Sequence, residues 1–184
     1  MVAAATLFHV KLALSDVERN VYEQLDLRLA QHPSENKRFL VTRLVAYALS
    51  YEEGIQFSKG GVSSTDEPAV IVRDPTGRVL AWIEVGSPSA ERLHRASKAA
   101  ERVAVFTSGD LSALEDAARE GEIHGATEIE VWRLEASFLD AVGERLERRA
   151  VAELVHSGGR LYVTLDGQVL EGGVARAPLL DSSR

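Results

Sequence analysis

The chain contains no cysteine, and this absence excludes several kinds of site at once. Disulfides, thiolate zinc sites and cysteine nucleophiles are ruled out. A zinc site would need histidine and carboxylate ligands, yet the five histidines never occur at the spacing of a metal-binding helix. The phosphate-loop pattern GxxxxGK[ST] and the dinucleotide pattern GxGxxG are also missing. Nucleotide-binding loops of these two kinds are therefore excluded.

Long apolar runs are missing as well. No segment approaches the roughly 20 residues of a membrane span, and residues 1–6 lack the basic and apolar parts of a signal peptide. We therefore expect a cytoplasmic protein with no membrane partner. The formal net charge of −7 means that the surface as a whole repels nucleic acid. A nucleic-acid role would need a local basic patch.

The composition that remains is that of a folded globular protein, with 45% hydrophobic and 27% charged residues. Its length predicts one domain, residues 1–184. The patterns favour a mixed α/β sheet flanked by helices, because helices and strands alternate in the second half. In the first half we expect an antiparallel hairpin of strands 6–14 and 22–29, a helix capped by Ser34 and ending near Tyr51, and a mobile Gly-rich loop within 55–65. In the second half we expect helices 89–100, 111–120 and 135–149 alternating with strands 102–107 and 128–134. A hairpin around 161–167 and a frayed end should complete the chain.

A second hairpin in the middle of the chain carries the most suggestive acid. Residues 69–73 and 79–85 flank Asp74-Pro75-Thr76-Gly77, whose proline and glycine predict a type I turn followed by a one-residue bulge. Glu84 interrupts the apolar run near the carboxyl end of the second strand. The carboxyl ends of strands are where open α/β sheets place their sites. A surface carboxylate at the strand exit is the simpler alternative.

The register of this hairpin decides which acid accompanies Glu84. A bulged turn places Pro68 opposite Glu84 and Asp66 diagonal to it, at roughly 7 to 8 Å. A two-residue turn places Glu67 directly opposite instead. Either register predicts a metal site of Glu84 with Asp66 or Glu67, because Mg²⁺ or Mn²⁺ is commonly held by one or two carboxylates together with a substrate phosphate.

The helix after this hairpin carries a basic stripe. Arg92, Arg95 and Lys98 fall within about a third of the helix circumference, opposite an apolar side. Such a stripe beside carboxylates predicts phosphate binding and offers a local surface for a nucleic-acid partner, although a solvated basic face is the commoner case. Glu35 stands in the first turn of the earlier helix, where the helix dipole alone favours an acid.

Several short segments, in this order and spacing, give the chain a family resemblance. It is similar to the bacterial YaeQ family over essentially its whole length. The segments are His32-Pro33-Ser34-Glu35, Phe57-Ser58-Lys59-Gly60, Asp66-Glu67-Pro68, Arg73-Asp74-Pro75-Thr76-Gly77, Trp82-Ile83-Glu84-Val85-Gly86 and Glu91-Arg92-Leu93-His94-Arg95-Ala96-Ser97-Lys98-Ala99-Ala100.

The resemblance implies a variant PD-(D/E)XK nuclease-like fold, a restriction-endonuclease-like core with additional antiparallel hairpins. In that fold an Asp and a Glu on adjacent strands bind a divalent metal, which implies Asp66 or Glu67 with Glu84. Glu35 is then the acid supplied by the first helix. A lysine is expected two residues after the Glu, but this chain has Gly86 there. A basic residue from the next helix would have to replace it, with Lys98 favoured over Arg95.

Two functions follow as hypotheses. The first is a metal-dependent phosphodiesterase or nuclease that uses Glu35, Asp66, Glu84 and Lys98 with Mg²⁺ or Mn²⁺. The second is a non-catalytic regulatory or binding protein that keeps the nuclease-like fold. The missing lysine and the acidic surface favour the second hypothesis, and fold alone does not decide between them.

Overall fold

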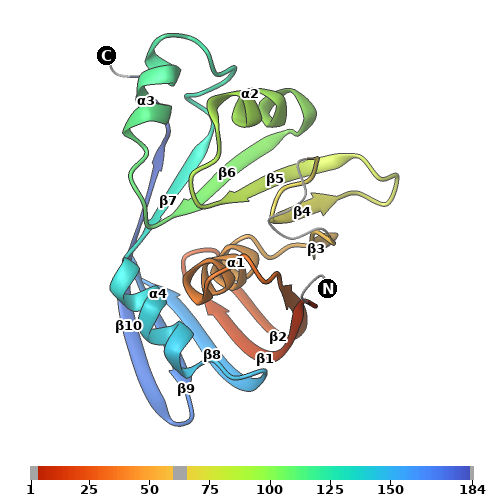
Figure 1. The fold of residues 1–184 in the computed structure, drawn as a ribbon, viewed down its shortest axis with the longest axis vertical. Coiled ribbons are helices and arrows are strands. Elements are labelled where there is room, and N and C mark those ends of the chain that lie inside the picture. The colour runs from red at the N-terminus through yellow and green to blue at the C-terminus, as the bar shows by residue number, and fades with distance from the viewer. Residues whose placement is uncertain (1–3, 60–65, 183–184) are drawn as a thin grey trace.

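The computed structural model describes residues 4–59 and 66–182, whose strands form one strongly bent mixed sheet (Figure 1). Within these residues the sheet has 10 strands in the order β2-β1-β8-β9-β10-β7-β6-β5-β4-β3. Its two parts meet at β10, which pairs with β9 through residues 168–173 and with β7 through residues 174–178. The strands are β1 (Thr6–Asp16), β2 (Val21–Gln31), β3 (Ile55–Phe57), β4 (Val70–Arg73), β5 (Val79–Val85), β6 (Arg102–Thr107), β7 (Glu130–Leu134), β8 (Arg149–Ser157), β9 (Arg160–Leu165) and β10 (Gln168–Pro178).

The helices cover both faces of this near-barrel sheet. Helix α1 fills the space that the bent sheet encloses, and α4 lies beside α1, whereas α2 and α3 cover the outer face of the upper part (Figure 1). The hydrophobic core is accordingly divided in two, one cluster around α1 and one under α2 and α3. No helix among the described residues is long and apolar enough to cross a membrane. The helices are α1 (Lys37–Leu49), α2 (Ala90–Ala99), α3 (Ser112–Arg119) and α4 (Ala136–Arg145).

The first hairpin and the helix after it follow from local sequence signals. The predicted antiparallel pairing is confirmed, and β1 and β2 place alternate leucine and valine side chains in the core. The helix begins later than predicted. Asn36 is its N-cap, and its side chain accepts a 2.8 Å hydrogen bond from the amide of Phe39. Ser34 is not the cap, because its hydroxyl is bonded to the ring of His32.

The alternating half of the chain has the predicted parallel core but a different end. Strands β5, β6 and β7 pair in parallel, as expected. The helix predicted for 135–149 ends at Arg145, and Arg149 instead begins β8, which runs parallel to β1. The prediction of a frayed end directly after the hairpin was also wrong, because β10 continues to Pro178 and joins the two parts of the sheet.

The central hairpin contains one irregularity that the sequence did not reveal. The turn is the predicted bulged type: the Asp74 amide donates to the Arg78 carbonyl at 3.0 Å, and Gly77 has φ +89°. The pairing register of β4 with β5 also shifts between Val72 and Arg73: Val72 pairs with Ala81 and Arg73 with Val79, so Leu80 has no residue opposite it in β4. The loop expected within 55–65 begins as strand β3, and residues 60–65 lie outside the described residues.

Candidate functional site

Glu84 is buried, which rules out the alternative of a surface carboxylate. It lies near the end of β5 and is 4% exposed. Its neighbours Ile83 and Val85 belong to the core around α1, whereas Trp82 packs against the core under α2. Since successive side chains of a strand point to opposite faces, Glu84 faces α2 together with Trp82. The indole Nε1 of Trp82 donates to Glu84 Oε1 at 2.6 Å.

Arg92 supplies the charge that makes this burial tolerable. Ser89 caps α2, and the first turn of the helix carries Arg92 over the end of β5. Arg92 Nε donates to Glu84 Oε1 at 2.6 Å, and one of its terminal nitrogens donates to the carbonyl of Glu67 at 2.6 Å. A buried carboxylate needs such a partner, because an unpaired buried charge is strongly destabilising. Arg92 therefore joins β5, α2 and the segment that enters β4.

The extra residue in β5 changes which acid shares the face of Glu84. Val70 pairs with Ile83, so continuing the ladder by one residue places Ala69 opposite Glu84. The predicted turn is present, but counting outward from it fails: Pro68 is not opposite Glu84, and β4 begins only at Val70, so Asp66 and Glu67 precede the ladder. The carboxylate of Glu67 is 3.6 Å from Arg73.

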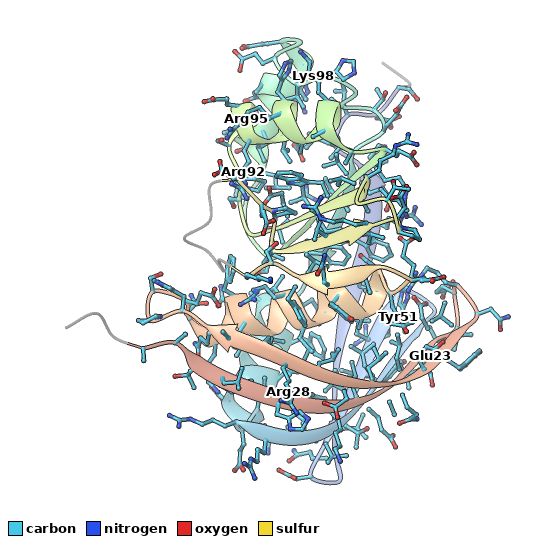
Figure 2. All side chains as sticks on the ribbon, turned by 90° about the vertical axis from the view of Figure 1, so that its right-hand side faces the viewer. Glu23, Arg28, Tyr51, Arg92, Arg95 and Lys98 are labelled. Carbon is cyan, nitrogen blue, oxygen red and sulfur yellow. The ribbon has the colours of Figure 1, made fainter. Side chains whose placement is uncertain are left out.

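Lys98 does not meet these acids. It is exposed, and it lies six residues beyond Arg92, which is about 9 Å along a helix axis. Figure 2 shows Arg92, Arg95 and Lys98 in order along α2, with Lys98 at the end away from the sheet. The basic residue that reaches Glu84 is thus Arg92, which the sequence placed in the phosphate-binding stripe. Arg95 is exposed on the same helix.

Glu35 lies on the other side of the sheet from Glu84. Its side chain is fully buried and accepts two hydrogen bonds from a terminal nitrogen of Arg43, at 2.9 and 3.2 Å. That nitrogen also donates to the carbonyl of Ala30, and the guanidinium stands 5.6 Å from the ring centre of Phe57. Because α1 packs on the Ile83 face of β5, the predicted grouping of Glu35 with Glu84 does not occur.

The carboxylates that the sequence selected are not gathered into one group in the described structure. Magnesium requires several oxygen ligands in near-octahedral geometry. Across residues 4–59 and 66–182, no group of three or more His, Asp or Glu side chains is arranged to hold a metal ion. Glu84 instead directs one oxygen at two nitrogen donors, Arg92 and Trp82. The donor set is that of an ion pair.

A cleft that the sequence did not predict opens on the α1 face of the sheet. It holds about 250 Å³ and lies where β5 and β6 end, beside the first turn of α1. Gly86 turns the chain away from β5 with φ +89°, and a side chain there would meet the ring of Phe39. The only sequence signals were two runs of small residues after strands. The cleft is lined by Ser34, Glu35, Asn36, Arg38, Phe39, Thr42, Val85, Gly86, Ser87, Thr107, Ser108 and Gly109.

Comparisons with known proteins agree on one family. The model of the YaeQ protein family matches residues 1–172. Two curated relatives, each called an uncharacterized protein YaeQ, are 27% identical to this chain. The match to the Escherichia coli K12 protein spans 172 residues, which is 93% of this chain and 94% of that protein. The match to the Salmonella typhi protein spans 165 residues, which is 89% of this chain and 91% of that protein.

Two solved structures have the same fold. The crystal structure of YaeQ protein from Pseudomonas syringae has a TM-score of 0.84 and 31% identity, covering 94% of this chain and 95% of that one. The structure from Xanthomonas axonopodis pv. citri has a TM-score of 0.82 and 28% identity, covering 95% and 99%. The chain therefore belongs to the YaeQ protein family.

Proposed function

We propose that this protein is a non-catalytic binding protein whose ligand occupies the cleft at the ends of β5 and β6. The observation that carries the proposal is the pairing of Glu84 with Arg92 at 2.6 Å, where the metal hypothesis needs a cation. Glu35, the second acid implied by the resemblance, is likewise neutralised by Arg43. Each of these two carboxylates is therefore engaged by an arginine.

The position of the cleft supports a role in ligand binding. Open α/β sheets bind ligands beyond the carboxyl ends of their parallel strands, and β5 and β6 are such a pair. The lining combines one aromatic ring, Phe39, with serine and threonine hydroxyls. Its one cation, Arg38, is already held by Asp140 at 2.6 and 2.8 Å. An uncharged polar small molecule matches this chemistry best.

A thermal-shift screen tests the cleft. Nucleosides and monosaccharides are added to the full chain and to Ser87→Trp, which fills the cleft from an exposed position. Gln168→Trp, in the exposed β9–β10 turn, is the matched control. We expect a compound that raises the melting temperature of the wild type and of the control but not of Ser87→Trp. Equal shifts in all three proteins, or none in any, would refute the proposal.

A metal-dependent phosphodiesterase or nuclease, acting with Mg²⁺ or Mn²⁺, is the competing function. The element order α1-β3-β4-β5-α2-β6 supports it, since an antiparallel meander is followed by a helical crossover to a parallel strand, in keeping with the fold that the resemblance implies. The test incubates single- and double-stranded DNA and RNA with the protein, either metal, or a chelator. We expect no cleavage. Cleavage that both the chelator and Glu84→Ala abolish would establish the nuclease and overturn our proposal.

A further inference from the structure

A basic groove lies on the outer face of the lower part of the sheet, whereas the cleft lies on the α1 face. It holds about 410 Å³ and is lined by Leu7, His9, Arg28, Arg148 and Arg149. The even-numbered residues of β1 point into the core, so the odd-numbered residues, His9 among them, point outward. Figure 2 shows Arg28 on this lower part, at the opposite end of the molecule from Lys98.

Strand register brings three of these side chains into one row. His9 pairs with Arg28 across the antiparallel β1–β2 ladder and with Arg149 across the parallel β1–β8 ladder. Directly opposite side chains on one sheet face have Cβ atoms about 4.5 to 5.5 Å apart. Arg148 stands at the start of the row, where its carbonyl accepts a 2.7 Å hydrogen bond from the amide of His9. The groove is therefore built by the sheet itself.

The arginines of this groove lack acidic partners, unlike most others. Within the described part of the chain, none of Arg28, Arg148 and Arg149 forms an ion pair or a side-chain hydrogen bond with a described residue. Asp26, which is on the same strand as Arg28, is bonded to His9 Nε2 at 2.5 Å. Arginines that do form ion pairs are Arg19, Arg38, Arg43, Arg73, Arg78, Arg92, Arg102, Arg119, Arg133, Arg160 and Arg176.

The uncompensated charge is unfavourable in the protein alone. Arg28, Arg148 and Arg149 line one groove, and like charges that share a surface repel one another. The field of the groove also reaches its neighbour Lys37, whose pKa is lowered by burial and then by the Arg148 guanidinium. A chain of net charge −7 that nevertheless gathers three such arginines in one concave surface resembles a site whose counter-charge comes from a ligand.

We propose that this groove binds a small ligand bearing two linked phosphoryl groups. The guanidinium is planar and binds phosphate oxygens through two parallel hydrogen bonds, and it stays charged at all relevant pH values. Strands are about 4.8 Å apart, so Arg28 and Arg149 approach from either side of His9, two strand spacings apart. That spacing suits a diphosphate held from both ends. Leu7, which is 58% exposed at the rim, offers apolar contact to an attached organic group.

The acidic surface favours a small anion over a nucleic acid. The groove is confined to the ends of three strands, and a longer polyanion would extend from it over a protein of net charge −7. The same phosphate chemistry can come from one phosphoryl group, from two, or from a nucleic-acid backbone. The test therefore compares inorganic phosphate, inorganic pyrophosphate and a short oligothymidylate at matched ionic strength, with sulfate as the reference anion.

Binding is measured by calorimetry and thermal melts on the full chain, on Arg28→Gln, on Arg149→Gln and on Arg95→Gln. Arg95 is the matched control, because it is an exposed arginine on α2 that also forms no ion pair with a described residue. We expect pyrophosphate to bind the wild type more tightly than the other anions do. Its affinity should be at least about tenfold lower for either groove variant and unchanged for the control. Without ligand, the groove variants should melt at the same or a higher temperature, which separates lost binding from lost folding.

Four results would overturn this proposal. Stabilisation of the wild type by pyrophosphate that is no greater than by sulfate would show that the groove has no preference for phosphate. Equal affinity for inorganic phosphate would remove the requirement for two phosphoryl groups. Tighter binding of the oligothymidylate through Arg28 and Arg149 would identify a nucleic-acid surface instead. An equal loss in Arg95→Gln would move the site to α2.

Discussion

Replacing Arg92 by methionine leaves the apolar stem but removes the charge that faces Glu84. The Glu84 side chain is 6% exposed and that of Arg92 is 20% exposed, so the pair is nearly buried. Removing one partner of a buried pair costs about 3 to 5 kcal/mol, which we reduce to about 2 to 4 kcal/mol because Arg92 retains some contact with water. For a chain of this length the melting temperature should fall by about 5 to 15 °C.

A double-mutant cycle measured by urea denaturation separates the ion pair from other effects. Glu84→Gln keeps an acceptor for Trp82 Nε1 and leaves a partly hydrated guanidinium, so it should cost about 1 to 2 kcal/mol. The double variant should lose less stability than the sum of the two single variants, by at least about 1 kcal/mol. Additivity within about 0.5 kcal/mol would mean that the two groups are not coupled, and our account of Glu84 would fail.

Three further substitutions test the local structure. Hydrogen bonds from the Thr76 hydroxyl and, to a smaller extent, from backbone amides lower the pKa of Asp74 below its ordinary value of 3.8. The stability that the Asp74 carboxylate contributes is therefore present above pH 3.8 and is lost as the pH falls through the folded-state pKa. Asp74→Asn should flatten the dependence of the unfolding free energy on pH in that acidic range. Gly86→Ala should cost about 1 to 2 kcal/mol in urea unfolding, because φ is +89°. Gly172→Ala should lower the melting temperature, since its Cβ would lie 2.5 Å from Phe138.

The parts of the fold that follow from short-range patterns could be predicted from the sequence. The alternation in β1 and β2 and the cap at Ser89 depend on neighbouring residues only. Strand β8 was missed because the charged residues just before it and its first residue, Arg149, continue a helical pattern. Its alternation is visible only in Ala152, Leu154 and His156, which are buried. Val151, on the opposite face of the strand, is 74% exposed. Only the long-range pairing with β1 shows that this segment is a strand.

The candidate site was predictable in one residue and not in its partner. Glu84 was found because an acid in an apolar strand is unusual. Its partner was missed for two reasons: the irregularity at Leu80 shifts the ladder by one residue, and no pattern distinguishes Arg92 from the other cations of α2. Burial of Leu93 and Ala96 fixes how α2 sits, and this orientation, set by tertiary packing, directs Arg92 at the sheet.

Arg92 and Gly86 together explain why a single substitution would not restore the nuclease-like residues that the resemblance implies. A lysine at position 86 would have to adopt the left-handed backbone conformation in which the glycine sits, which costs about 1 to 2 kcal/mol. Even then the carboxylate of Glu84 would still be paired with Arg92. Removing Arg92 would leave a buried charge without a compensating group, because the described residues around it do not provide a metal-binding set. Arg92 thus supplies the positive charge beside Glu84 that a metal ion would supply in a nuclease-like site. This pairing supports the proposal of a non-catalytic binding protein.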